Sequence, residues 1–240
     1  MKLKNTPIFW VIFSTILLLL MPAGLQQLAA QSTNATENSD FQLARVQYRG
    51  GGDWYNDPSA LPNLIRYVNS NLPVSINPTI EDVSIGSRDI FKYPFLFLTG
   101  HGNITVNSAE ANNIREYLDR GGFLFIDDDY GLDAFIRPIL KQIFPNDELI
   151  DLPFTHPIFH QVYSFDQGLP KIHEHDNKPP QGFAIFRNGR MVVFYGYESN
   201  ISDGWTNADV HGVSESLREL SLQMGTNILH YALTTHRMLN

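Results

Sequence analysis

Two runs of four apolar residues constrain the fold of this chain more than any other feature. Phe95–Leu98 and Phe123–Ile126 contain no polar residue, as is typical of parallel strands that are buried on both faces of a sheet. Between them, residues 107–118 have the pattern of a helix that begins with a capping box formed by Asn107 and Glu110. A strand, a helix and a second strand in this order predict a parallel βαβ unit with its helix packed on the sheet.

The same alternation of strands and helices continues along the rest of the chain. Asn188-Gly189 between two apolar stretches is a strong signal for a β-hairpin turn. The hydrophobic fraction of 43% is sufficient for a buried core. We therefore predict one α/β domain over residues 41–240 with a mostly parallel sheet. Further strands are expected at 43–48, 74–76, 149–152, 183–186 and 191–195, and further helices at 61–68, 133–144 and 214–238.

The first forty residues differ from the rest in composition. Residues 1–30 combine Lys2 and Lys4 with an apolar stretch and a small-residue end at Ala29 and Ala30, which is the layout of a secretory signal peptide. An uncleaved membrane anchor is the alternative, although the apolar stretch is short for a span. Residues 31–40 are polar and are expected to form a flexible leader. The sequence thus predicts export to the periplasm or the extracellular space.

Composition and missing motifs exclude several classes of protein. The chain has no cysteine, which rules out disulfides, thiolate metal sites and a cysteine nucleophile. A formal net charge of -8 argues against nucleic acid as a partner. The glycine-rich and lysine motifs of nucleotide-binding loops and the serine elbow of α/β-hydrolases are also missing.

Four polar segments follow the predicted strands directly, at residues 50–57, 99–102, 127–131 and 195–198. Ligands of parallel α/β sheets bind outside the carboxyl ends of the strands, so these segments are expected to surround one polar pocket. The simpler alternative is that glycine and aspartate are there because turns favour them. Three adjacent carboxylates favour a functional interpretation, since like charges so close together need a cation or hydrogen-bond donors.

Two functions fit such a pocket. In the first, His101, Asp127 and Asp128 hydrolyse a small polar ligand, of which a carbohydrate is one candidate, by acid–base chemistry without a cysteine nucleophile. In the second, the domain is not catalytic and binds a glycan or a protein of the bacterial envelope through aromatic side chains. The expected ligand-binding residues are Gly51, Gly52, Asp53, Trp54, Tyr55, Glu198 and Trp205.

A divalent cation is compatible with either function, and the sequence offers two weak sets of ligands for it. Asp127 and Asp128 form one set. His156 and His160 form the other, because two imidazoles four residues apart share a face on a helix. Pro157 disfavours a regular helix there, and turn or capping roles are the alternative for both histidines.

Several segments together resemble the bacterial domain of unknown function 4159. They are Arg49–Pro58, Leu98–Gly102, Gly121–Asp128, His156–Phe159 and the strand that begins at Gly189-Arg190. The first and third are the most specific, and the resemblance covers nearly all of residues 41–240. Relatives in this family are often joined to membrane segments in envelope proteins, which implies an envelope protein as a further partner.

That family resembles the class I glutamine amidotransferase-like superfamily, which includes trehalose-utilisation-type proteins. The resemblance implies a flavodoxin-like three-layer α/β/α sandwich with a mostly parallel sheet. The superfamily's nucleophile is a cysteine at a sharp turn between a strand and a helix, and the equivalent turn here lies near Asp127 to Tyr130. Because the chain has no cysteine, it is not expected to be a glutamine amidotransferase.

Overall fold

The two apolar runs form neighbouring parallel strands in the middle of the sheet. They are β3 (Phe95–Leu98) and β4 (Phe123–Asp127), and Phe95 pairs with Phe123 through to Leu98 with Ile126. All nine residues of these two strands are buried. Apart from Asp127 at the end of β4 they are apolar, because helices cover both faces of the sheet, as the sequence predicts.

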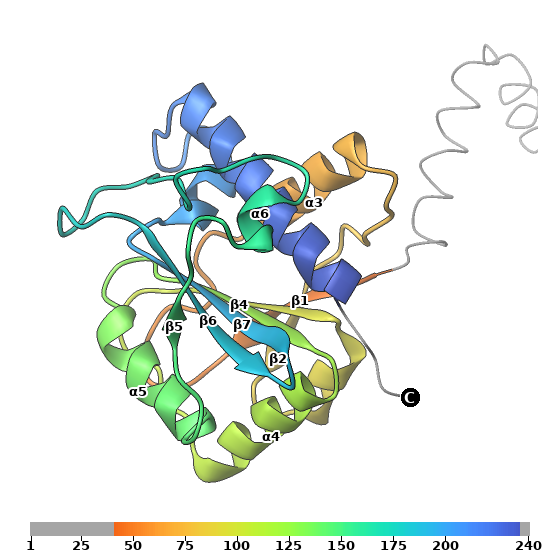
Figure 1. Cartoon of the computed structure of the whole chain (residues 1–240), viewed down its shortest axis with the longest axis vertical. Coiled ribbons are helices and arrows are strands. Elements are labelled where there is room, and N and C mark those ends of the chain that lie inside the picture. Colours follow the sequence, from red (N-terminus) through yellow and green to blue (C-terminus); the bar gives the residue numbers. More distant parts are fainter. Residues whose placement is uncertain (1–40, 236–240) are drawn as a thin grey trace, which may run out of the picture. The chain divides into compact units, whose positions relative to one another are not determined.

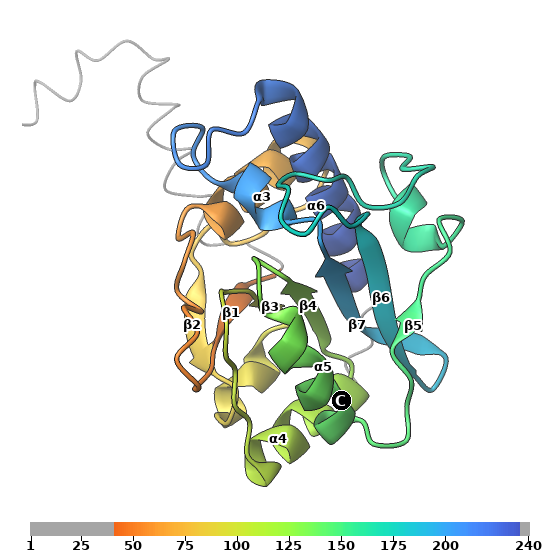
Figure 2. The same ribbon diagram turned by 90° about the vertical axis from the view of Figure 1, so that its left-hand side faces the viewer.

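The computed structural model describes residues 41–235, which contain a seven-stranded sheet in the order β2-β1-β3-β4-β7-β6-β5 (Figure 2). The first five strands in this order are parallel, whereas β6 is antiparallel to β7 and β5 is antiparallel to β6. The mostly parallel α/β sheet predicted from the sequence is therefore confirmed. The other strands are β1 (Leu43–Gln47), β2 (Glu81–Ser84), β5 (Ile150–Asp151), β6 (Gln181–Arg187) and β7 (Arg190–Tyr197).

Residues 41–235 contain four α-helices, and two of them cover each face of the sheet (Figure 1). On one face lie α3 (Ala60–Asn71) and α6 (Glu215–Thr235), and on the other lie α4 (Ser108–Asp119) and α5 (Asp133–Ile143). The predicted capping box is present at the start of α4. Three short 3-10 helices lie in the connections: η1 (Arg88–Lys92), η2 (Pro157–His160) and η3 (Ile201–Trp205).

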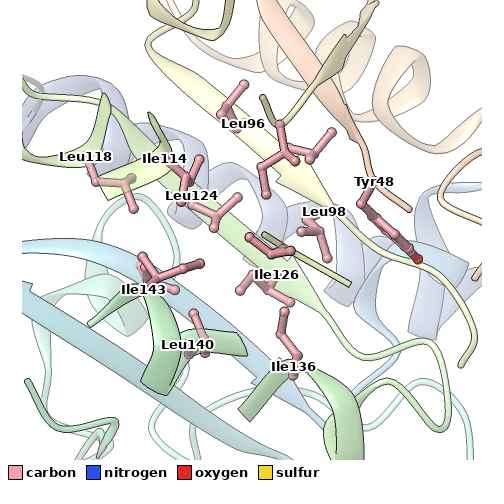
Figure 3. Close-up of a cluster of buried hydrophobic side chains, with 14 of the residues drawn as sticks. Tyr48, Leu96, Leu98, Ile114, Leu118, Leu124, Ile126, Ile136, Leu140 and Ile143 are labelled. Atoms are coloured by element: carbon pink, nitrogen blue, oxygen red, sulfur yellow. The ribbon is translucent and has the colours of Figure 1, made fainter. Parts of the chain in front are cut away.

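The two faces of the sheet carry different side chains. Because alternate residues of a strand point to opposite faces, Leu96 and Leu98 join the aliphatic cluster against α4 and α5 (Figure 3). Phe95 and Phe97 join an aromatic cluster against α3 and α6. Trp205 of η3 lies in this second cluster, with its ring centroid 5.8 Å from that of Phe97.

The sequence prediction missed one strand and misplaced another. Residues 74–76 contribute only an isolated bridge between Ile76 and Phe41. The edge strand is instead β2, in which Val83 is the buried residue and its neighbours are exposed. A short edge strand with one buried side chain lacks the apolar pattern that identifies buried strands.

The predicted signal peptide and leader lie outside the described residues, as does the end of the helix expected to reach residue 238. Within residues 41–235 there is no helix with both the length and the apolar character that crossing a membrane requires.

Candidate functional site

The loops that follow β1, β3, β4 and β7 meet at the carboxyl-terminal edge of the parallel strands. The β1 loop is bonded to the β3 loop, where Gly52 N donates to Asn103 O at 2.9 Å. The β4 loop contacts the β7 loop, where Asn200 Nδ2 donates to Asp129 Oδ1 at 3.1 Å. We call these four loops, residues 48–57, 99–103, 127–131 and 197–203, the rim. The four loops thus meet as the strand order predicts, and the polar pocket expected among them stays a prediction.

Glycine in the rim serves mainly to let the loops approach each other. A Cβ on Gly52 would lie 2.8 Å from His101 O, and Gly50, at φ +124°, would place one 2.8 Å from Asn103 O. Gly51, at φ +98°, has open space where its Cβ would be. Of the two glycines expected to bind ligand, Gly52 thus packs against the β3 loop, and Gly51 alone borders open space.

His101 and Asp53 form a pair that joins the ends of β1 and β3. Asp53 Oδ1 accepts a hydrogen bond from His101 N at 2.5 Å, and its Oδ2 lies 3.0 Å from His101 Nδ1. The imidazole is half exposed, with a side-chain accessibility of 51%. A third group, Asp129 Oδ2, lies 3.6 Å from the same ring nitrogen. The histidine ring is therefore oriented from two sides while part of it faces solvent.

The electrostatics of this pair favour a charged imidazolium beside a carboxylate. Burial acts to lower the pKa of His101, but Asp129 and Asp53 outweigh it, and the pKa of His101 is raised. Burial acts to raise the pKa of Asp53, but the hydrogen bonds from His101 outweigh it, and the pKa of Asp53 is lowered. The two groups thus stabilise each other's charged form, the imidazolium of His101 and the carboxylate of Asp53.

The three consecutive aspartates have three different environments, and the first holds η3. Asp127 Oδ2 accepts from Ser202 N at 2.7 Å and from Ser202 Oγ at 2.6 Å, and its Oδ1 accepts from Ile201 N at 3.3 Å. The residue is fully buried, and burial raises its pKa to about 7. These contacts give Asp127 the role of anchoring the loop after β7 to the end of β4.

Asp128 forms its hydrogen bonds on the side of α5 rather than with η3. Its Oδ1 accepts from Leu132 N at 3.0 Å, and its backbone N donates to Gly196 O at 3.0 Å. Burial raises the pKa of Asp128 to about 6. It is the third aspartate, Asp129, that lies beside His101. Asp127 and Asp128 were the sequence-based catalytic candidates, and Asp129 was missed because the spacing of the triplet does not determine which carboxylate faces the β3 loop.

A second group of titratable side chains adjoins Asp129. Asp57, Asp129 and Asp203 offer carboxylate oxygens that all lie within 4.8 Å of one another, and His173, Asp203 and His211 do the same with their ligating atoms. We call these five residues the carboxylate–histidine cluster. Sequence reasoning did not select them as ligands. They come from four separate connections between strands and helices. The sequence signals were the polar segments 50–57 and 127–131 and the histidines in the connections before β6 and α6.

Several rim residues adopt left-handed backbone conformations that non-glycine residues seldom take. Tyr130 has φ +81° and Glu198 has φ +57°, while Asp57 and Asn200 have φ values of +48° and +51°. Asparagine and aspartate tolerate this region, but tyrosine and glutamate are unusual there. Such conformations concentrate at functional sites, where the surrounding structure holds them in place.

Comparison with known protein families connects this geometry to a family. The family model described as Domain of unknown function (DUF4159) matches residues 42–233, which include the rim and all five residues of the carboxylate–histidine cluster. The chain belongs to the DUF4159 family. No curated protein matches the sequence.

The remaining ligand-binding candidates occupy varied positions in this DUF4159 domain. Glu198 is buried and paired with Lys171 at 2.7 Å. Trp54 is partly buried, with the Arg45 guanidinium 5.4 Å from its ring centroid, whereas Tyr55 is 61% exposed.

The prediction that Trp205 contacts ligand is not supported by its position, because it is 1% exposed and its Nε1 donates to Ser221 O at 2.9 Å. The Trp205 side chain packs in the aromatic core between the sheet and α6, so its ring is not exposed at the rim.

His156 caps the N-terminus of η2 in the DUF4159 domain, and His160 is the last residue of that helix. His156 packs against Phe186, at the hairpin end of β6, and its Nδ1 accepts from Ile158 N at 3.2 Å. His160 Nε2 donates to Phe154 O at 2.8 Å. Each imidazole thus has a local structural partner, as in the turn and capping alternative considered for the sequence.

Proposed function

We propose that this DUF4159 domain binds a small polar ligand at the rim and hydrolyses it, with His101 as the general acid and base. The observation that carries the proposal is the His101–Asp53 pair, in which a half-exposed imidazole is held through its Nδ1 by a carboxylate at 3.0 Å. A histidine fixed in this way keeps its other ring nitrogen, Nε2, for a water molecule or a substrate atom. Asp53 is the positioning residue, and Asp129 stabilises the imidazolium.

The chemistry assigned to His101 is proton transfer during attack by water. The imidazole accepts a proton from water as the water oxygen bonds to the electrophilic atom of the substrate. The bond to the leaving group then breaks, and the imidazolium returns its proton to that group. Because the chain has no cysteine, a thioester intermediate is excluded.

We further propose a flavodoxin-like fold related to the class I glutamine amidotransferase-like superfamily. The order β2-β1-β3-β4-β7 of the parallel strands supports this, since it corresponds to the doubly wound order of flavodoxin. The left-handed Tyr130, at φ +81° directly after the aspartates, supports a sharp strand-to-helix turn where that superfamily has its nucleophile. In this chain the turn carries carboxylates instead.

The site of action that we propose is the periplasm or the extracellular space. The charged start and apolar stretch of residues 1–30 support export with cleavage after Ala30. Intact-mass measurement on protein from the envelope fraction tests this. A mass that retains residues 1–30 would favour the membrane anchor.

A second candidate function is glycan binding without catalysis. It is favoured by Tyr55 and Tyr130, two rim tyrosines that are 61% and 50% exposed. The Tyr130 ring is stacked on His175 with the centroids 4.5 Å apart, so one of its faces is left for a sugar. If this is the function, substitution of Tyr55 by alanine weakens glycan binding while substitution of His101 leaves it unchanged.

The decisive experiment measures hydrolysis of a panel of chromogenic esters, glycosides and phosphoesters by the purified protein. We expect His101→Gln to reduce kcat/KM for the accepted substrate at least about 100-fold, and Asp53→Asn to reduce it less. His160→Gln is the matched control, because it removes an imidazole on η2. Hydrolysis that survives His101→Gln, or that falls equally in His160→Gln, would contradict the proposed role.

A further inference from the structure

We propose that the carboxylate–histidine cluster binds one divalent transition-metal cation, of the kind that imidazole and carboxylate ligands hold together, such as Zn²⁺ or Mn²⁺. The ligands are Asp57, Asp129, Asp203, His173 and His211. This site does not depend on the proposed hydrolysis, because cation binding is a property of the protein without substrate.

The fold brings these ligands together from four connections, of which the one between β7 and α6 supplies two. Asp57 lies between β1 and α3, Asp129 follows β4, and Asp203 lies in η3 after β7. His173 precedes β6 and His211 precedes α6. Residues so far apart in sequence converge only because the parallel strands end at one edge and the loops before β6 and α6 extend over it.

Two histidine–aspartate pairs in direct contact hold the ligand atoms of the cluster near one another, and each pair must open slightly to admit a cation. His173 Nδ1 lies 2.5 Å from Asp203 Oδ2, and His211 Nε2 lies 2.8 Å from Asp57 Oδ1 and 3.7 Å from Asp203 Oδ1. With ligand bonds of about 2.0–2.2 Å, two ligands of one cation are at most about 4.4 Å apart. The separations of up to 4.8 Å in both groups therefore need only small side-chain movements to enclose a cation.

Unpartnered buried oxygens give an independent indication of a ligand at this place. Among the residues that the structure describes, Asp203 Oδ1 and Asp57 Oδ2 are buried and have no hydrogen-bond partner. The side chains that carry them are only 2% and 8% exposed. Asn200 Oδ1, beside Asp129, is unpartnered as well. Buried polar atoms are almost always satisfied, so several unpaired oxygens in one cluster indicate a cation that they bind.

The net charge of the cluster also favours a bound cation. Three aspartates face two histidines, and both Asp129 and Asp203 are almost completely buried. A divalent cation would relieve the repulsion among these carboxylates, which two imidazoles alone do not neutralise fully.

The ligand types favour a transition metal over Ca²⁺ or Mg²⁺. The hard cations take oxygen ligands, whereas imidazole suits Zn²⁺ and its neighbours, and carboxylate oxygen also suits Mn²⁺. The chain has no thiolate to offer, so any such site must be built from nitrogen and oxygen. We therefore expect Zn²⁺ and Mn²⁺ to bind much more tightly than Mg²⁺.

The test is titration of the chelator-treated, dialysed protein with Zn²⁺, Mn²⁺, Mg²⁺ and Ca²⁺ by calorimetry and thermal shift. We expect one equivalent of Zn²⁺ or Mn²⁺ to bind and to raise the melting temperature, because a ligand of the native state stabilises it. His211→Gln and Asp57→Asn, which alter different loops, should each weaken Zn²⁺ binding at least about tenfold. His160→Gln should leave it unchanged.

A measurement on the unaltered protein keeps the proposal testable if these variants fold poorly. The visible absorption of bound Co²⁺, or X-ray absorption at the zinc edge, should show nitrogen and oxygen ligands only. Failure to bind Zn²⁺ or Mn²⁺ would overturn the proposal, as would full affinity in both His211→Gln and Asp57→Asn. Since no substrate is used, loss of this site and failure of the His101 mechanism are distinguishable.

Discussion

Replacing Asp128 by asparagine tests whether this carboxylate is structural or catalytic. The side chain is buried, and its Oδ1 accepts from Leu132 N at 3.0 Å. Asparagine offers a carbonyl oxygen of the same geometry and is an equally good capping residue, so this hydrogen bond should survive. The substitution then removes only a buried negative charge.

The expected change in unfolding free energy follows from the pKa of Asp128. Burial raises it from 3.8 to about 6, so the folded protein holds a proton at pH 5 that the unfolded chain releases. Between these values the folded state binds more protons, and the stability of the wild-type protein falls as the pH rises. The asparagine variant lacks this dependence. We expect the two proteins to be about equally stable at pH 4, and Asp128→Asn to be more stable by about 1–3 kcal/mol at pH 7–8.

Urea denaturation at pH 4, 5, 6 and 8 measures the difference, with hydrolysis and Zn²⁺ binding assayed in parallel. Both functions should persist in Asp128→Asn. A variant that is destabilised at pH 8, or a stability difference that does not change with pH, would refute the electrostatic reasoning. Loss of hydrolysis with stability preserved would show instead that Asp128 acts in catalysis.

Three other predictions concern packing, capping and chemistry. Gly225→Ala should cost about 1–3 kcal/mol of unfolding free energy, measured by urea denaturation, since its Cβ would lie 2.8 Å from Trp205 Cζ2; unchanged stability would contradict the close packing of α6. Glu110→Gln should cost about 0.5–1.5 kcal/mol at pH 7 by weakening the capping box of α4. Burial acts to raise the pKa of Glu110, but the hydrogen bonds from Arg49 and Asn107 N outweigh burial and lower the pKa. The stabilising effect of the Glu110 carboxylate is therefore present at neutral pH and is lost as the pH falls below about 4.5. A difference in unfolding free energy between variant and wild type that persists undiminished at pH 3 would refute this. Glutaminase assay should detect no glutamine hydrolysis, because the chain has no cysteine; activity abolished by a rim substitution would reveal another nucleophile.

The sequence by itself determined the features that depend on local pattern. The apolar runs at Phe95–Leu98 and Phe123–Ile126 predicted two buried parallel strands, because only a sheet covered on both faces needs apolar residues at every position. Asn188 and Gly189, at φ +51° and +75°, form the predicted hairpin turn because both accept the left-handed conformation that it requires. The capping box and the exclusion of cysteine chemistry likewise follow from residue identity alone.

Only the tertiary structure decided which side chains form the candidate site. The three adjacent aspartates are alike in sequence, yet one anchors η3, one holds the start of α5 and one lies beside His101. Asp203 and His211 lie beside Asp57, although about 150 residues of the chain separate each of them from Asp57. Loop residues follow no period that reveals the direction of a side chain. Their positions are fixed by how distant strands and helices pack together, which is also why Trp205 is in the core rather than at the rim.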